Sequence, residues 1–166
     1  MSIEIREADL SKEADAAGLL AVLDSYATDE MGGGAPLDAA ARQRLIPALR
    51  EQTNALVLLA FHNEAVGAVG LATSFYGFST FAARPLLNVH DLCVLPAFRG
   101  RGIGRALLAE AEARACARGC AKLTLEVLES NARARGLYYS HGFRDFELAG
   151  VVRRTLFLSK PLVHRP

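Results

Sequence analysis

The spacing of apolar residues along the chain changes between a period of two, typical of strands, and a period near four, typical of amphipathic helices. Period-two runs predict strands at residues 3–8, 55–61, 65–75, 85–94 and 122–127. Helical spacing predicts one helix from Ser11 or Asp15 toward Tyr26, and others at residues 37–50, from about Gly102, and at residues 131–141. Two last strands are expected around residues 144–148 and 153–158.

Glycine, proline and short polar segments separate these elements. The run "GGG" at residues 32–34 and Pro36 end the first helix, and the polar turn "HNE" at residues 62–64 predicts a hairpin. Residues 76–84 are aromatic, small and irregular, which predicts a loop. Because strands and helices alternate and hairpins are expected near both ends, the pattern indicates an α/β or α+β fold with a partly antiparallel sheet.

Composition and charge narrow the classes of protein. The 166 residues, 51% apolar and 22% charged, fit a single globular domain that spans residues 1–166. The net charge of +1, from 19 basic and 18 acidic side chains, gives no overall field that would attract nucleic acid or a membrane surface. The first ten residues do not resemble a signal peptide, and the apolar run at residues 55–61 is too short to span a bilayer.

Three cysteines make an odd count, which favours a reducing compartment, so a cytoplasmic location is expected. Cys116 and Cys120 lie four residues apart, but no cluster of histidine or acidic residues joins them. They are therefore expected to be small core residues, and no metal site is predicted.

The segment "RGRGIG", residues 99–104, follows a predicted strand and precedes a predicted helix. A helix start of this kind directs unpaired N–H groups and the positive end of the helix dipole outward, which suits a phosphate. A turn without a ligand is the alternative interpretation. A dinucleotide-binding fingerprint fits poorly because Arg105 occupies the place of its third glycine, and no P-loop tripeptide is present.

Two spaced motifs carry a family resemblance. R-x-x-G-x-G is filled by Arg99, Gly102 and Gly104, and N-x-x-A-x-x-L-Y-x-x-x-G-F follows about thirty residues later, at Asn131, Ala134, Leu137, Tyr138, Gly142 and Phe143. With both motifs on helices that follow strands, the chain resembles the GCN5-related N-acetyltransferase (GNAT) family, which uses acetyl-coenzyme A as co-substrate. The resemblance implies a mixed sheet of about six or seven strands with about four helices, splayed between strands four and five, where the cofactor lies.

The resemblance also implies roles for individual residues. Residues 99–104 would hold the pyrophosphate through backbone amides, the strand end would bind the pantetheine arm, and Asn131 would contact that arm from the other side. The arginines can balance the phosphate charges. The residues implied in cofactor binding are Leu92, Cys93, Val94, Arg99, Gly100, Arg101, Gly102, Ile103, Gly104, Arg105, Asn131 and Tyr138.

Acetyl transfer to an amine needs a donor for the oxyanion, a group for the departing thiolate and an acceptor for the amine proton. The backbone N–H near Val94 is a candidate oxyanion donor. Tyr138 is the candidate for the thiolate because it, and not Tyr139, lies four residues before Gly142; a core aromatic is the alternative.

The candidate proton acceptors are His90 and Asp91, two polar residues inside an apolar strand. Simple alternation would place Val89, Asp91 and Cys93 on one face and Asn88, His90 and Leu92 on the other. Imidazole titrates nearer neutrality than a carboxylate, which favours His90. Satisfied buried polar groups are the alternative, and Glu126 in the facing strand is a third candidate.

The sequence gives less information about the acceptor of the acetyl group. The segment "YGFSTFAARPLLNVHDL" resembles the matching part of diamine and polyamine acetyltransferases, although those relatives carry an acidic pair where this chain has His90 and Asp91. Asp24, Asp29 and Glu30 are candidates to attract a cationic amine, or are solvated. The expected enzyme is an acetyl-coenzyme A-dependent N-acetyltransferase acting on a small primary amine by direct attack. A peptide or protein amine, an aminoglycoside or an amino acid as acceptor, and a non-catalytic acyl-coenzyme A-binding module, are alternatives; a homodimer is left open.

Overall fold

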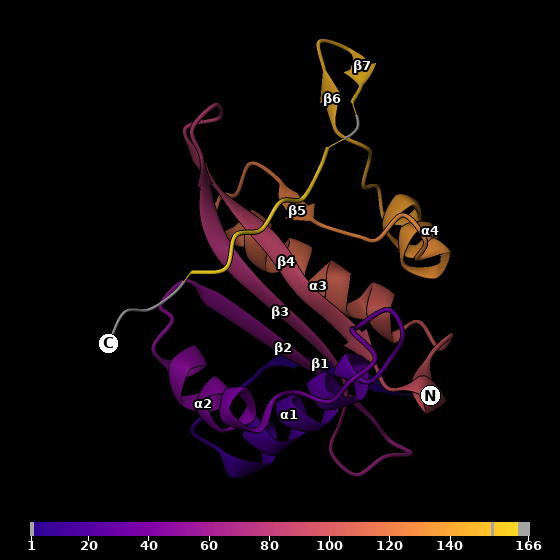
Figure 1. Cartoon of the computed structure of the whole chain (residues 1–166). Helices are drawn as coiled ribbons and strands as arrows, with labels where there is room; N and C mark the ends of the chain where they lie inside the picture. Colours follow the sequence, from indigo (N-terminus) through magenta and orange to yellow (C-terminus); the bar gives the residue numbers. More distant parts are fainter. Residues whose placement is uncertain (1, 154, 163–166) are drawn as a thin grey trace.

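A five-stranded sheet is the central feature of the computed structural model, which describes residues 2–153 and 155–162 (Figure 1). Its strands are β1 (Ile3–Glu7), β2 (Ala55–His62), β3 (Ala68–Ser79), β4 (Arg84–Val94) and β5 (Leu123–Leu125), in that spatial order. Neighbours pair antiparallel except β4 and β5, which are parallel. The predicted mixed sheet is confirmed, with five strands in place of six or seven.

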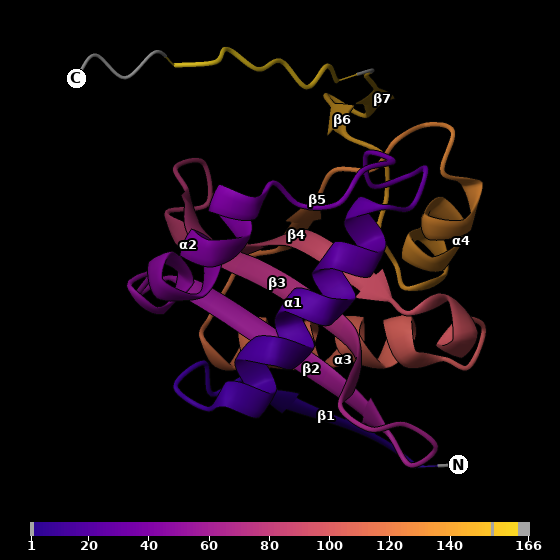
Figure 2. The same ribbon diagram turned by 60° about the horizontal axis from the view of Figure 1, so that its bottom comes forward.

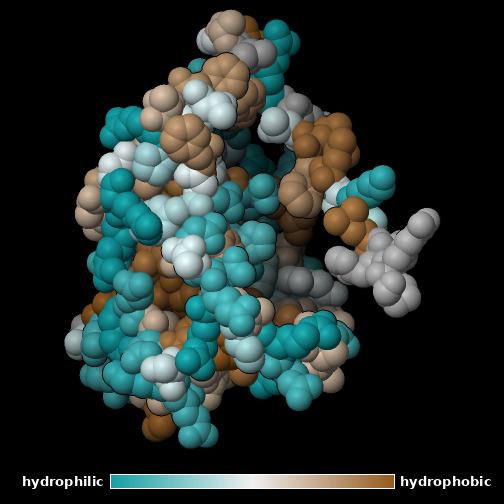
Figure 3. Space-filling model, turned by 90° about the vertical axis from the view of Figure 1, so that its left-hand side faces the viewer, coloured by the Kyte–Doolittle hydropathy of each residue, from teal (hydrophilic) through white to brown (hydrophobic). Residues whose placement is uncertain are grey.

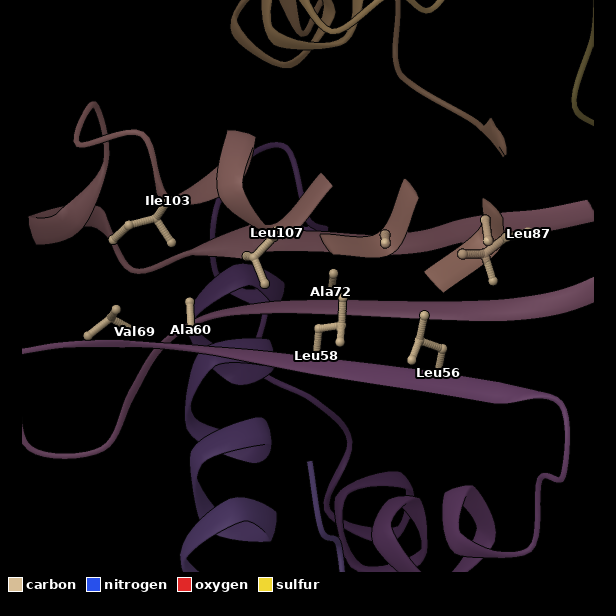
Figure 4. Close-up of a cluster of buried hydrophobic side chains, with 10 residues drawn as sticks. Leu56, Leu58, Ala60, Val69, Ala72, Leu87, Ile103 and Leu107 are labelled. Carbon is tan, nitrogen blue, oxygen red and sulfur yellow. The ribbon is translucent and has the colours of Figure 1, made fainter. Parts of the chain in front are cut away.

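Helices cover both faces of this sheet. α1 (Glu13–Ala27) and α2 (Ala39–Arg50) lie on one face and α3 (Ile103–Ala117) on the other (Figure 2). α4 (Ala132–Ser140) follows β5, and the short 3-10 helix η1 (Pro96–Phe98) follows β4. Two apolar cores result. Figure 4 shows the one under α3, which contains Leu56, Leu58, Ala60, Val69, Ala72, Leu87, Ile103, Leu107, Ala111 and Ala115.

Local contacts fix where the helices begin and end. The carboxylate of Asp38 accepts a hydrogen bond from the Ala41 amide at 3.0 Å, so α2 begins at residue 39 and not at 37 as predicted. Asn131 caps α4 in the same way through the Ala134 amide, at 3.0 Å. A Cβ atom at Gly32 would lie 1.9 Å from the Tyr26 carbonyl oxygen, so only glycine fits the turn after α1.

The start of α1 is held to β1 by an ion pair that the sequence did not reveal. Asp15 is 2% exposed, and its two carboxylate oxygens accept hydrogen bonds from the Arg6 guanidinium, each at 2.6 Å. The Asp9 amide donates to it as well, at 2.8 Å. These contacts, led by the Arg6 hydrogen bond, lower the pKa of Asp15 to about 2 against the opposing effect of burial.

The hairpin of β3 and β4 is longer than predicted. Residues 76–79, expected in a loop, continue β3 because backbone pairing extends to Ser79 opposite Arg84. The prediction of a loop over this part of residues 76–84 was wrong. Pairing of β3 with β2 reaches Phe75 opposite Ala55, so beyond that point β3 and β4 form a two-stranded ribbon that leaves the body of the sheet.

The C-terminal strands do not join the central sheet. β6 (Glu147–Leu148) and β7 (Val151–Val152) form a separate two-stranded hairpin that stands beyond β5 in Figure 1. The strand predicted at residues 153–158 is absent from the described part of that range; residue 154 lies outside the described residues. Leu156, Phe157 and Leu158 are 76%, 77% and 83% exposed, because no neighbouring strand covers them within the described chain.

A β-bulge interrupts β4 at His90. Thr73 pairs with Asp91, whereas the next residue, Ser74, pairs with Val89, so His90 is an extra residue. Side chains therefore change phase at this point: Leu87 belongs to the core under α3, Leu92 packs against that core, and Cys93 belongs to the core on the opposite face. The predicted uninterrupted alternation along this strand was wrong.

The three cysteines have different surroundings. Cys93 is buried and Cys120 half-buried, but Cys116 is exposed on α3, so its predicted place in the core was wrong. All three thiols are free.

Across the described ranges, no helix combines the length and the apolar character that crossing a membrane requires.

Candidate active site

A cavity of about 880 Å³ opens where β4 and β5 diverge. The two strands pair only over Leu87–Val89 and Leu123–Leu125, and β4 then runs on to Val94 with no strand on that side among the described residues. The predicted splay between the fourth and fifth strands is thus present. The cavity is walled by the end of β4, the turn before α3, the first turn of α3, α4, and the end of α1 with the loop after it.

The sequence predicted most of this wall. Of the twelve residues implied in cofactor binding, all but Arg101 line the cavity. It did not predict the wall contributed by α1, because nothing local in the sequence places the end of that helix beside β4. The lining residues missed are Tyr26, Met31, Phe98, Ser130, Ala132, Arg133, Ala134 and Leu137, the last two having been seen only as motif positions.

The last peptide groups of β4 face the cavity. The Leu95 N–H donates to the Val69 carbonyl at 2.9 Å and so points toward β3. Peptide groups alternate in direction along a strand, so those of Val94 point away from β3. The Val94 carbonyl accepts a hydrogen bond from Arg99 Nε at 2.9 Å on that side. The Val94 N–H therefore lies on the cavity side, where an oxyanion donor was expected.

The start of α3 forms an open cradle. Gly102 precedes the helix with φ of 82° and supplies no side-chain cap, so the first amides of the helix lack a capping partner. A Cβ atom at Gly100 or Gly102 would meet no described atom within 4 Å, which leaves space for a bulky anion. Backbone amides and the positive end of the helix dipole together fit a phosphate group.

The three arginines of this turn each contact a protein group. Arg99 Nη2 lies 2.8 Å from Asp29 Oδ2, and Arg101 Nη1 lies 2.7 Å from Glu64 Oε2. Arg105 Nη2 donates to the Ser140 hydroxyl at 2.7 Å. The three guanidinium groups place positive charge around the start of α3, and each also links this turn to another part of the chain.

Tyr138 lines the cavity from α4, and its neighbour Tyr139 does not. Burial, with smaller effects from nearby Tyr26 and Cys93, raises the pKa of Tyr138 to about 12. Its hydroxyl is therefore neutral and protonated near pH 7. Tyr139 is 38% exposed, and its hydroxyl donates to Asp145 Oδ1 at 2.8 Å, outside the cavity.

None of the three candidate proton acceptors lines the cavity, although His90 and Asp91 directly precede the lining residue Leu92. His90 is exposed at the bulge, with its ring edge-on to Phe75 at a centroid distance of 5.7 Å. Asp91 is half-buried; burial raises its pKa, while charge on His90 and a hydrogen bond from Thr73 act in the opposite direction. Glu126 is exposed just beyond β5.

The three acidic residues near the end of α1 have different surroundings. Asp24 Oδ2 lies 2.9 Å from Arg42 Nη1, and its other oxygen accepts from the Leu37 amide at 3.1 Å. Asp29 is engaged by Arg99. Glu30 is exposed and lines the cavity, which makes it the acidic residue best placed to meet a cationic ligand.

A splayed mixed sheet with a free strand edge, an open helix start that fits a phosphate, and a half-buried tyrosine meet in the wall of one cavity. This arrangement defines a class of protein with surfaces that fit both the phosphates and the amide-bearing arm of one extended ligand.

Comparison with known proteins gives the family. The model of the Acetyltransferase (GNAT) family matches residues 20–143, and the chain belongs to this family, as its motifs predicted. It is 35% identical over 77 residues to thialysine N-epsilon-acetyltransferase of Bos taurus, a match that covers 46% of this chain and 45% of the bovine protein. The chain thus spans less than half the length of that relative.

Two further relatives extend the comparison. An uncharacterized N-acetyltransferase of Archaeoglobus fulgidus is 35% identical over 102 residues, which cover 61% of this chain and 68% of that protein. The solved structure of AAC(6')-Iy in complex with the bisubstrate analogue CoA-S-monomethyl-acetylneamine has a TM-score of 0.74 at 15% identity. It covers 98% of this chain and 100% of the solved one, a likeness of fold.

Proposed function

We propose that the protein is an acetyl-coenzyme A-dependent N-acetyltransferase, a single domain that acetylates the primary amine of a small molecule. One observation carries the proposal: the open helix start at Gly102 and the free edge of β4 lie in the wall of one cavity. The first can bind phosphates and the second an amide-bearing arm, so the pyrophosphate and the pantetheine arm of acetyl-coenzyme A each have a matching surface.

The cavity residues take the following roles in this proposal. Amides at the start of α3 hold the pyrophosphate, and the edge of β4 from Leu92 to Val94 pairs with the pantetheine arm. Asn131, which caps α4, contacts that arm from the other side. The Val94 N–H donates to the thioester oxygen, where negative charge develops when the amine attacks directly.

Proton transfer completes the reaction. Tyr138 donates a hydrogen bond to the departing thiolate, in keeping with its neutral hydroxyl in the cavity. The amine proton passes through ordered water toward His90 or Asp91, which precede the lining residues of β4 directly. The raised pKa of Asp91 favours this, since a more basic carboxylate accepts a proton more readily near neutral pH.

The acceptor is proposed to be a small, cationic amine. Glu30 in the cavity wall supports this choice, and the bovine relative suggests thialysine as a first compound to test. A coenzyme A release assay against thialysine, polyamines, amino acids, aminoglycosides and peptides tests the proposal. Turnover with peptides alone would favour a protein or peptide acceptor, and acetyl-coenzyme A binding without turnover on any amine would favour a non-catalytic binding module.

We propose further that the chain works in the cytoplasm as a homodimer. The three free thiols favour a reducing compartment.

Apolar side chains of the C-terminal segment are exposed, and Figure 3 shows brown groups in the stretch leading to the grey end of the chain. A second copy would cover them. Light scattering tests the dimer, and Phe157→Ser should shift it toward monomer. The exposed residues are Val151, Val152, Leu156, Phe157, Leu158 and Leu162.

A further inference from the structure

Asp29 accepts four backbone hydrogen bonds within the loop between α1 and α2. Its carbonyl oxygen accepts hydrogen bonds from the amides of Gly32, Gly33 and Gly34 at 2.8, 3.2 and 3.1 Å. Its side-chain Oδ1 accepts from the Met31 amide at 3.0 Å. Since Met31 lines the cavity, Asp29 helps to position this wall, together with the Tyr26 hydroxyl, which donates to the Met31 carbonyl at 3.2 Å.

Asp29 is also held by Arg99 to the phosphate cradle, the turn of residues 99–104 at the start of α3. Arg99, which opens the turn before α3, reaches Asp29 Oδ2 with Nη2 at 2.8 Å and the Val94 carbonyl with Nε at 2.9 Å. One planar guanidinium thus joins three parts of the wall: the loop after α1, the end of β4 and the cradle. The two residues are 70 positions apart in the sequence.

This ion pair is more shielded from water than the neighbouring ion pair of the same turn. Side chains of Arg99 and Asp29 are 26% and 21% exposed, and both line the cavity. The pair of Arg101 and Glu64, two residues further along the same turn, is 35% and 53% exposed, and neither residue lines the cavity. A partly shielded pair held in a fork by a second hydrogen bond loses less of its strength to water and salt.

We infer that Arg99 and Asp29 are positioning residues that couple occupation of the phosphate cradle to order in the loop forming the amine side of the cavity. The inference rests on the proposed function, since it needs coenzyme A in the cradle. A ligand on the amides of this turn restricts the backbone of Arg99, and the guanidinium passes that restriction to Asp29. Coupling of this kind is reciprocal, so an ordered loop also favours the cofactor.

The coupling has a consequence for the order of binding. Acetyl-coenzyme A bound first would order the wall that meets the amine, which includes Glu30 and Met31. The opposite arrangement, in which Arg99 turns to the phosphates and releases Asp29, would loosen the same loop. The two arrangements predict changes of opposite sign in the exchange of the loop amides.

Amide hydrogen exchange with and without saturating coenzyme A tests the inference without needing an amine substrate. In the parent, exchange at Gly32, Gly33 and Gly34 should slow by about 5-fold or more, the low end of typical coupling between sites. In Asp29→Asn the slowing at these amides should fall below about 2-fold, whereas a general stabilisation by the ligand would persist. Glu64→Gln is the matched control, because it uncouples Arg101 from its partner and should keep the parent's slowing.

The outcomes separate the two proposals. If calorimetry finds no coenzyme A binding to the parent, the proposed function fails and the inference with it. If coenzyme A binds and slows exchange at residues 103–105 while the loop amides are unchanged or faster, only the coupling is overturned. Equal slowing in the parent and in Asp29→Asn would overturn it as well.

Discussion

Replacing Tyr138 by phenylalanine removes one hydroxyl from the cavity and keeps the ring. The ring lies 5.8 Å from that of Phe143 between centroids, a contact that does not use the hydroxyl. We therefore expect Tyr138→Phe to change the free energy of unfolding by less than about 1.5 kcal/mol, as for other swaps that conserve volume. Its dissociation constant for acetyl-coenzyme A should match that of the parent.

The size of the effect on turnover follows from two pKa values. That of Tyr138 is about 12, and that of an ordinary thiol is about 8.5. Full proton transfer from Tyr138 to the departing thiolate would thus cost about 5 kcal/mol. A hydrogen bond from the neutral hydroxyl avoids this cost and contributes about 1.5 to 3 kcal/mol to a charged acceptor. Tyr138 is therefore expected to stabilise the departing thiolate by the hydrogen bond and not by full proton transfer. Loss of this hydrogen bond should lower kcat by about 10- to 150-fold.

Steady-state release of coenzyme A at saturating acetyl-coenzyme A, between pH 6 and 9, measures this loss. Tyr139→Phe is the matched control, because its hydroxyl bonds to Asp145 outside the cavity and its removal should leave kcat at the parent value. An unchanged kcat in folded Tyr138→Phe would refute the reasoning. So would equal losses in the two variants, which would indicate a structural effect of α4.

Three further predictions concern other parts of the chain. Gly102→Glu should weaken acetyl-coenzyme A binding in calorimetry at least about 10-fold more than Gly102→Ala, because both carry the strain of positive φ but only one places a carboxylate in the cradle; equal affinities would contradict the phosphate site. His90→Ala should lower kcat/KM more at pH 7 than at pH 9, where more of the amine is already free, because His90 is proposed to accept the amine proton; an equal loss at both pH values would direct attention to Asp91. Asp15→Asn should lower the free energy of unfolding by about 2 kcal/mol at pH 7, because the folded-state pKa of Asp15, about 2, lies below its ordinary 3.8. That contribution is present above pH 4 and is lost as the pH falls toward 2, so urea unfolding should find the difference from the parent shrinking over this window; a constant difference would rule out the ion pair as its cause.

Elements with local causes could be predicted from the sequence. The glycine-rich turn and the start of α3 follow from residues 99–104 alone, and capping by Asn131 fixes the start of α4. The C-terminal segment shows the limit of this reasoning. Alternation at residues 153–158 indicates a strand, but it does not say which strand edge is available to pair with it.

The parts of the site that escaped prediction depend on contacts between distant residues. The bulge at His90 is set by the register of β4 against β3, which hydropathy does not encode. Likewise, Asp29 was a candidate for binding an amine, because a carboxylate near a helix end carries no sign of its partner 70 residues away. The residue types at these positions indicate which chemistry is possible, and the contacts in the fold show which group each side chain meets.

The extra residue at His90 makes β4 two short strands of opposite phase joined end to end. Deleting it would leave Val89 opposite Ser74 and Asp91 opposite Thr73, so the two halves would join in one regular alternation with their present partners and faces. The Val94 carbonyl would keep its direction away from β3, and Arg99 would keep its acceptor. The strand can therefore lose this one residue without moving the wall of the cavity, which makes residue 90 a position where the length of the chain and the architecture of the site are independent.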